Sequence, residues 1–284
     1  TKKAKFKKKK KMILKYLISL SFWINEKSNK NSNTYFLGLS GGQGTGKTTI
    51  TALLEIILNK YFKKKVCAFS IDDFYKTKKE REKLSKNKHP LLKTRGVPGT
   101  HDINLIFDFL KKVKLKKKNN FLLPKFDKSI DDRAKKSMWK KINYIPDIVI
   151  LDGWCIGAKA QSNKLLTKAI NILEKKEDPK NVWRKYVNKQ LKTKYKVLFN
   201  KMNDIIYLNA SNFSLMKKWR IKQENKIRIK NVKKNSKVMT NKDILRFMMF
   251  YQRITQQMFK DMLKVSSAIL KLDSHHQIKN IKLS

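Results

Sequence analysis

The chain has 284 residues, of which 40% are hydrophobic, and its formal net charge is +48 at pH 7. This length suits one large α/β domain, and the apolar fraction is sufficient for a core. No run of eighteen uncharged apolar residues occurs, which argues against a membrane-spanning helix. Cys67 and Cys155 lie in apolar segments without metal-type spacing, so we expect buried free thiols in a reducing compartment.

The positive charge would ordinarily indicate nucleic-acid binding. Nearly all of the basic residues are lysines, however, and they are spread along the whole chain together with asparagine and isoleucine. This pattern fits a coding bias toward A/T-rich codons as well as it fits a binding face. We therefore favour compositional drift over a selected nucleic-acid surface, and we expect neither a specific nucleic-acid partner nor a membrane partner.

The first residues are dominated by lysine. We expect residues 1–11 to form a disordered tail ahead of a single domain over residues 12–284. The apolar run at residues 12–24 predicts an amphipathic helix that packs on this domain, because Lys15 interrupts it and no small-residue cleavage site follows. We expect a cytoplasmic protein, although the sequence leaves open an organellar transit peptide, and it does not indicate an oligomeric state.

The remaining segments alternate between strand and helix patterns. Apolar residues recur at helical spacing from Ile50 to Tyr61, and continuous apolar runs indicate buried strands. This alternation predicts an α/β fold, a three-layer sandwich of the P-loop NTPase type with a central, mostly parallel sheet and helical lid or insertions. The predicted strands cover residues 35–39, 66–71, 148–151, 205–208 and, as the final strand, 268–272. Further helices are predicted at residues 103–115, 213–228 and 243–263, and a solvated helix or loop at residues 76–93.

A glycine-rich segment separates the first strand from the helix that follows it. Strand, glycine loop and helix form the context that a phosphate-binding loop requires. Backbone N–H groups here would wrap the β-phosphate of ATP, Lys47 would bridge the β- and γ-phosphates, and the Thr48 hydroxyl would ligate Mg²⁺. The predicted ATP-binding residues are Gly41, Gly42, Gln43, Gly44, Thr45, Gly46, Lys47, Thr48 and Thr49.

Three aspartates follow predicted strands. Asp152 comes after residues 148–151 and could hold Mg²⁺ directly or through water, or it could simply begin a turn. Asp72 and Asp73 follow the second strand, where phosphoryl transfer to a hydroxyl needs a carboxylate to orient the hydroxyl and accept its proton. We favour Asp72 as this base and assign Asp73 to substrate binding or support, with helix N-capping by both as the alternative.

Other polar residues cluster around two further segments. Arg95, His101 and Asp102 flank a glycine pair and could bind an acidic substrate, or they could form a rigid turn with a structural Arg–Asp pair. Lys128 belongs to a second polar cluster that could instead be a solvated loop. Arg220 could close over the γ-phosphate as a lid residue, or it could pair with a glutamate four residues later. We assign Arg220 to catalysis, and Tyr75, Arg95, His101, Asp102 and Lys128 to substrate binding.

Taken together, these segments resemble one family. SGGQGTGKTT, SIDDFY, RGVPGTHD, FDKS…DR and LDGWCIG, in this order, resemble the D-glycerate 3-kinase family of plant and bacterial type, P-loop kinases related to phosphoribulokinase and uridine kinase. The resemblance covers roughly residues 15 to 273. It implies Mg-ATP-dependent phosphorylation of D-glycerate to 3-phosphoglycerate, and it supports Asp72 as the base.

One position departs from the family pattern. Asp152-Gly153-Trp154 stands where the family usually has Glu-Gly-Trp, so the reach of the shorter carboxylate to the metal is uncertain. Two alternatives remain open. One is a kinase of the same fold that acts on another hydroxyl, in a nucleoside, pantothenate or a sugar. The other is a non-enzymatic or nucleic-acid-linked P-loop protein.

If the charge is incidental to function, binding to DNA or RNA should be non-specific. Each neutralised phosphate releases counterions, so affinity should fall about 10³-fold or more between about 50 and about 200 mM salt. We expect fluorescence anisotropy to give similar Kd values for unrelated sequences. Tight binding of one sequence at physiological salt would contradict this interpretation.

Overall fold

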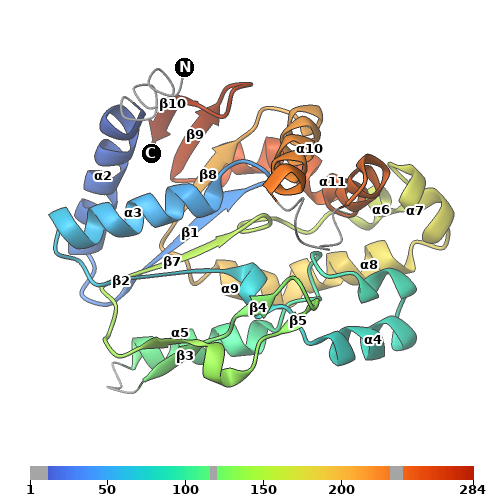
Figure 1. Cartoon of the computed structure of the whole chain (residues 1–284), viewed down its shortest axis with the longest axis horizontal. Coiled ribbons are helices and arrows are strands. Elements are labelled where there is room, and N and C mark those ends of the chain that lie inside the picture. Colours follow the sequence, from blue (N-terminus) through green and yellow to red (C-terminus); the bar gives the residue numbers. More distant parts are fainter. Residues whose placement is uncertain (1–11, 116–119, 231–238) are drawn as a thin grey trace.

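A six-stranded sheet runs through the centre of the computed structural model, which describes residues 12–115, 120–230 and 239–284 (Figure 1). The strand order is β10-β9-β8-β1-β7-β2. All neighbours pair in parallel except β10, which runs antiparallel to β9. The predicted α/β fold with a mostly parallel sheet is thereby confirmed. The strands are β1 (Tyr35–Gly41), β2 (Val66–Ser70), β7 (Ile148–Gly153), β8 (Asp204–Asn209), β9 (Ala268–Leu272) and β10 (Ile278–Leu283).

Helices cover both faces of this sheet (Figure 1). Because successive strand residues point to opposite faces, each strand contributes to two cores. Ile148 and Ile150 of β7 pack in the core under α2, α3 and the start of α10, whereas Val149 and Leu151 pack in the core with α5, α8, α9 and most of α11. These helices are α2 (Ile18–Asn29), α3 (Lys47–Tyr61), α5 (Ile103–Lys114), α8 (Val182–Gln190), α9 (Lys196–Phe199), α10 (Phe213–Lys230) and α11 (Asn241–Val265).

Several shorter strands, helices and turns lie outside the central sheet. The segment between α5 and β7 forms two small antiparallel pairs, β3 (Phe121–Leu123) with β6 (Lys140–Ile142), and β4 (Phe126–Asp127) with β5 (Asp132–Arg133). The remaining helices are α4 (Lys78–Asn87), α6 (Asn163–Thr167) and α7 (Ile172–Glu177). Single turns occur at η1 (Ile13–Leu17), η2 (Ile71–Phe74), η3 (Pro90–Lys93), η4 (Lys136–Met138) and η5 (Leu191–Tyr195).

Several elements differ from the sequence-based expectations. β9 is not the final strand, because the lysine-rich β10 pairs with it at the edge of the sheet. β2 ends at Ser70, so Asp72 and Asp73 lie in η2 rather than at the end of the strand. Residues 76–93 form α4 and η3, and Arg81 of α4 is buried, so this segment is not simply solvated.

The N-terminal prediction holds in part. The segment is helical as expected, with the π-helical turn η1 running directly into α2, and it continues to Asn29 rather than ending at residue 24. Three apolar residues of this region are buried against the domain: Leu17, Leu20 and Ile24. The tail predicted at residues 1–11 lies outside the described residues. Within the parts of the chain that the structure describes, no helix is both long and apolar enough to cross a membrane.

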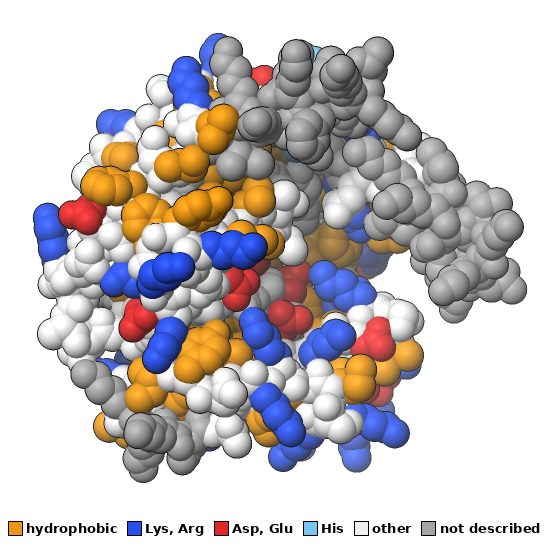
Figure 2. Space-filling model, turned by 60° about the vertical axis from the view of Figure 1, so that its left-hand side comes forward, with side chains coloured by type: hydrophobic (Ala, Val, Ile, Leu, Met, Phe, Trp, Pro, Cys, Tyr) orange, Lys and Arg blue, Asp and Glu red, His pale blue; other side chains and the backbone are white. Residues whose placement is uncertain are grey.

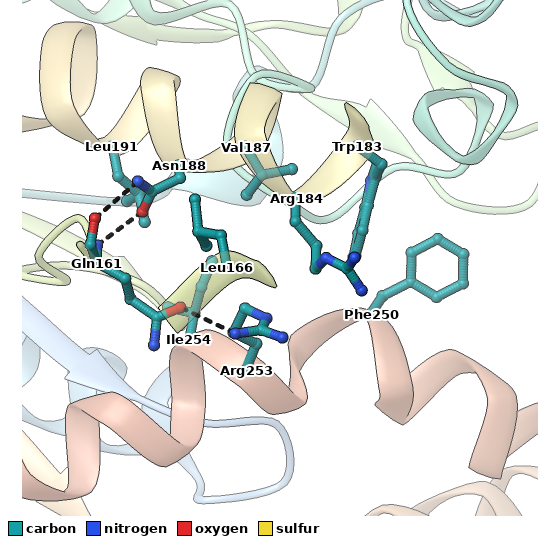
Figure 3. Close-up of a pocket in the computed structure, with 10 residues that line it drawn as sticks. All are labelled: Gln161, Leu166, Trp183, Arg184, Val187, Asn188, Leu191, Phe250, Arg253 and Ile254. Carbon is teal, nitrogen blue, oxygen red and sulfur yellow. Dashed lines mark hydrogen bonds between the residues drawn. The ribbon is translucent and has the colours of Figure 1, made fainter. Parts of the chain in front are cut away.

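A buried charge network joins the helices of the second half of the chain. The Glu174 carboxylate of α7 is fully buried and accepts hydrogen bonds from Arg253 of α11 at 2.6 and 2.8 Å and from Arg184 of α8 at 3.3 Å. Figure 3 shows the side chains of Arg184 and Arg253 reaching into the space between α8 and α11, beside Gln161 and Asn188. This carboxylate thus bridges two guanidinium groups and ties three helices together, and the buried Asp178 supplies a second negative charge 3.4 Å from Arg184.

We expect Glu174→Gln to destabilise the protein by about 3–5 kcal/mol, because it removes the charge partner of the buried Arg253 and leaves Arg184 paired with Asp178 alone. Urea denaturation would measure the loss. Glu177→Gln is the matched control, since Glu177 pairs with Arg246 at 2.6 Å on the surface, with 41% and 48% of the side chains exposed, and should cost at most about 1 kcal/mol. Equal effects of the two substitutions would contradict the importance of the network.

Candidate active site

The glycine loop connects β1 to α3 at the carboxyl end of the sheet. Gly44 and Gly46 have φ angles of 79° and 90°, a left-handed backbone that favours glycine. No side chain caps the N-terminus of α3, so its first N–H groups and the positive end of its dipole face the loop. Lys47 Nζ donates to the Gly42 carbonyl oxygen at 3.0 Å. This arrangement can hold the phosphates of a nucleotide.

The start of α10 packs directly on this loop. A Cβ atom added at Gly42 would collide with the Met216 side chain, and one at Gly44 would lie 3.2 Å from Trp219 Cβ. Close approach of a side chain therefore favours glycine at position 42, whereas close approach and the left-handed backbone both favour it at position 44. Arg220 follows Trp219, and its guanidinium pairs with Glu224 at 2.8 Å, the alternative weighed from the sequence.

Asp152 lies on β7 beside the glycine loop. Its register partners are Leu39 on β1 and Ser70 on β2, and its carboxylate accepts a hydrogen bond from Thr51 Oγ1 at 3.4 Å. Burial raises the pKa of Asp152 to about 6, and the neighbouring Asp72 and Asp73 also raise it, whereas Lys47 opposes the shift. An electrostatically crowded carboxylate of this kind gains from a cation.

The donor set therefore fits Mg²⁺. The Asp152 carboxylate and the exposed hydroxyl of Thr48, one helical turn before Thr51, are oxygen ligands of the kind that this ion prefers. The described residues contain no group of three or more His, Cys, Asp or Glu side chains arranged to hold a metal. Mg²⁺ retains several waters and is often bound by one or two protein ligands plus phosphate oxygens, so a sparse protein donor set suits it.

Asp72 and Asp73 occupy different environments within η2. Asp72 Oδ1 accepts from the Tyr75 hydroxyl at 2.9 Å, and Lys128 Nζ lies 3.5 Å from Oδ2. Although burial acts to raise it, the pKa of Asp72 is lowered overall, because Lys128 and the Tyr75 hydroxyl stabilise the carboxylate. Burial raises the pKa of Asp73, whose carboxylate accepts from the backbone N–H of Phe126. Asp72 is thus the carboxylate with side-chain partners in the site.

The loop at residues 95–102 brings further polar groups to Asp72. Arg95 pairs with Asp131 and lies 5.2 Å above the Phe126 ring. His101 is buried and stacks on Tyr75 with ring centroids 4.5 Å apart. Tyr75, His101 and Lys128 therefore surround the Asp72 carboxylate directly or in a second layer.

Asp102 has a different environment from the other predicted substrate ligands. Its carboxylate accepts from the Leu105 N–H at the start of α5 and pairs with Arg133 at 3.3 Å. Arg133 also donates to the Tyr75 carbonyl oxygen at 2.9 Å. These contacts connect the loop, α5 and the β4–β5 pair.

Some residues of the site were not identified from the sequence. Tyr251 of α11 packs its hydroxyl against Gly96, and Trp154 Nε1 donates to the Gly96 carbonyl oxygen at 2.8 Å. Tyr195 of η5 hydrogen-bonds to the same loop. In the sequence Tyr195 and Tyr251 look like ordinary core positions, whereas Trp154 belongs to the Asp152-Gly153-Trp154 motif but was given no role there. Figure 2 shows a hollowed face of the molecule on which acidic and basic side chains gather.

These features define a class of protein. A phosphate-binding loop follows the central strand β1 of a mostly parallel sheet, one carboxylate lies at the end of the neighbouring β7, and two lie in the turn after the next strand, β2. This is the arrangement of a P-loop kinase.

Comparison with known proteins supports this class. No family model matches the chain. The uncharacterized kinase mug58 of Schizosaccharomyces pombe is 28% identical over 237 residues, covering 81% of this chain and 82% of that protein. The chloroplastic D-glycerate 3-kinase of Arabidopsis thaliana is 33% identical over 165 residues, covering 54% of this chain but only 36% of that protein.

Two solved structures resemble the whole fold. The D-glycerate 3-kinase from Cryptococcus neoformans has a TM-score of 0.79 at 22% identity and covers 95% of this chain and 99% of its own. The YGR205w protein has a TM-score of 0.71 at 26% identity, with 96% and 95% covered. The resemblance to the D-glycerate 3-kinase family is thus confirmed, and the chain is an ATP-dependent phosphotransferase with the P-loop kinase fold.

Proposed function

We propose that this enzyme transfers the γ-phosphoryl group of ATP to the C3 hydroxyl of D-glycerate and forms 3-phosphoglycerate. The observation that carries the proposal is the environment of Asp72. A carboxylate suited to orient a hydroxyl lies next to Lys128, with Arg95 and His101 on the adjoining loop. D-glycerate presents a primary hydroxyl and a carboxylate, which match a base with the cations Lys128 and Arg95 near it. The names of two relatives support the same acceptor.

The nucleotide end of the reaction rests on the glycine loop. The N–H groups of residues 42–48 and the Lys47 ammonium would bind the β- and γ-phosphates. Mg²⁺, held by Thr48 and Asp152, would neutralise charge on the phosphate oxygens. The Asp152 carboxylate contacts Thr51 of α3, the helix that also carries Thr48, and this contact supports the assignment despite its shorter side chain. Arg220 would have to exchange its pairing with Glu224 for the γ-phosphate.

At the acceptor end, Asp72 would hold the C3 hydroxyl in line with the γ-phosphate. As the oxygen–phosphorus bond forms and the bond to the β-phosphate bridging oxygen breaks, the hydroxyl proton passes to the Asp72 carboxylate. Lys128 and Arg95 would contact the carboxylate of glycerate. Tyr75 keeps Asp72 oriented through its 2.9 Å hydrogen bond.

A screen of ADP release tests the choice of acceptor. The purified enzyme would be assayed with Mg-ATP and D-glycerate, uridine, pantothenate or a pentose phosphate. We expect turnover with D-glycerate to exceed turnover with every other acceptor tested. Preferential turnover of a nucleoside or pantothenate would show that the acceptor is that compound and not D-glycerate.

We further propose a cytoplasmic enzyme, with an organelle as the alternative that the chloroplastic plant relative suggests.

Lys47→Ala should reduce ADP release in the presence of acceptor to background while the fold survives. Lys47 neutralises phosphate charge in this proposal, and its described hydrogen bond is to the loop carbonyl rather than to the core. Circular dichroism and the thermal unfolding midpoint of the variant should match those of the parent. Near-normal turnover in a correctly folded variant would remove the loop from the mechanism.

Asp72→Asn should lower kcat by roughly 10²–10⁴, the range for loss of a general base, with ATP affinity nearly intact. The amide has the same shape but cannot take the proton, so kcat and kcat/KM should fall together. Asp73→Asn is the matched control at the neighbouring position. It should change the stability of the fold rather than kcat, because the Asp73 carboxylate accepts from the Phe126 backbone. If Asp73→Asn is inactive and Asp72→Asn turns over normally, the base is assigned to the wrong residue.

A further inference from the structure

Aromatic side chains from distant segments hold the loop at residues 95–102. Gly96 and Gly99 have φ angles of 136° and 101°, and each leaves room for a neighbouring ring. Tyr251 packs against Gly96, and Tyr186 packs against Gly99. A loop fixed in this way gives its last residues, including His101, a defined position.

Tyr195 is the partner of His101 within this clamp. Its side chain is fully buried, and its hydroxyl oxygen accepts from the Gly99 N–H at 3.0 Å. The same oxygen lies 2.6 Å from His101 Nδ1. A phenol that already accepts from an N–H can still donate its own proton. Donation by Tyr195 to Nδ1 places the imidazole proton on Nε2.

Two further observations describe the state of this ring. His101 is 2% exposed, and burial lowers its pKa to about 4, with Asp72 opposing the shift and Lys76 adding to it. The ring therefore stays neutral near pH 7. Among the residues that the structure describes, Nε2 of His101 has no hydrogen-bond partner. A buried N–H without a partner is costly, so it indicates a group that arrives with a ligand.

We propose that Tyr195 is a positioning residue that fixes His101 as a neutral imidazole protonated at Nε2, so that this N–H donates a hydrogen bond to an oxygen of the acceptor molecule. The proposal rests on the proposed function, because it assumes that the acceptor binds beside Asp72. His101 stacks on Tyr75, and the Tyr75 hydroxyl donates to Asp72, so the imidazole lies next to the residue that orients the base. A neutral donor recognises a carboxylate or hydroxyl oxygen without adding a charge near the base.

Nitrogen-15 NMR of the full-length enzyme tests the tautomer without turnover. The chain has only four histidines, and His101→Leu would assign the signal. We expect His101 to show protonated Nε2 and unprotonated Nδ1 from about pH 8 to about pH 5. The groups facing the ring are Tyr75, Tyr195, Asp72 and Lys76. Protonation at Nδ1, or an imidazolium at pH 7, would overturn the proposal.

Kinetics test the role of this N–H in acceptor binding. Tyr195→Phe should mix the tautomers and raise the KM for D-glycerate about tenfold, the effect of one hydrogen bond, with the KM for ATP unchanged. Tyr186→Phe is the control from the same clamp, because the Tyr186 ring also packs on Gly99 but its hydroxyl does not contact His101 in the described structure; it should change neither KM. Equal increases in both KM values for Tyr195→Phe would indicate a merely structural role and overturn the proposal.

A second pair of variants keeps the test independent of the folding of Tyr195→Phe. His101→Gln places an amide N–H near the position of Nε2 and should retain much of the acceptor affinity, whereas His101→Leu should lose it. If the two variants are equally impaired, the N–H does not bind the acceptor. An enzyme inactive on D-glycerate would refute the proposed acceptor, whereas the NMR result would still decide the role of Tyr195.

Discussion

The central position of β1 in a parallel sheet determines where every charged group of the site lies. Parallel strands place their carboxyl ends on the same edge, and the register sets Asp152 of β7 beside Leu39 of β1 and Ser70 of β2. The loops that leave these strands must therefore meet. The phosphate-binding loop occupies the centre of that edge, and the carboxylates lie on its β7 and β2 side.

Helices from the second half of the chain pack against the loops at this edge of the sheet. Met216 and Trp219 of α10 pack on the glycine loop, and Tyr251 of α11 packs on the loop at residues 95–102. Arg253, two residues after Tyr251, is fixed by the buried carboxylate of Glu174. The buried ion network is far from the phosphate loop in sequence, but it anchors the helix that supports the acceptor side. The same helix, α11, therefore contributes both to the geometry of the site and to the stability of the fold.

The sequence was most informative where the determining interactions are local. The glycine loop, its flanking strand and helix, and the carboxylates after β2 and β7 could be located because each depends on adjacent residues and on strand ends. Sequence did not indicate Tyr195, whose role depends on a contact with His101 across 94 positions. Nor did it indicate β10, because an edge strand rich in lysine lacks the apolar pattern of a buried one. The buried role of Arg81 depends on the Lys93 and Asp131 carbonyl oxygens, which lie far from it in the chain.

In the proposed reaction, one edge of the sheet brings the γ-phosphoryl group of ATP to the primary hydroxyl of a small hydroxy acid and releases ADP. Carbon-13 and phosphorus-31 NMR of the product from uniformly ¹³C-labelled D-glycerate and Mg-ATP tests this claim most directly. The account predicts a single new phosphomonoester whose phosphorus is coupled through oxygen to C3. A phosphorus attached at C2, or no phosphorylated glycerate beside active turnover of another acceptor, would contradict it.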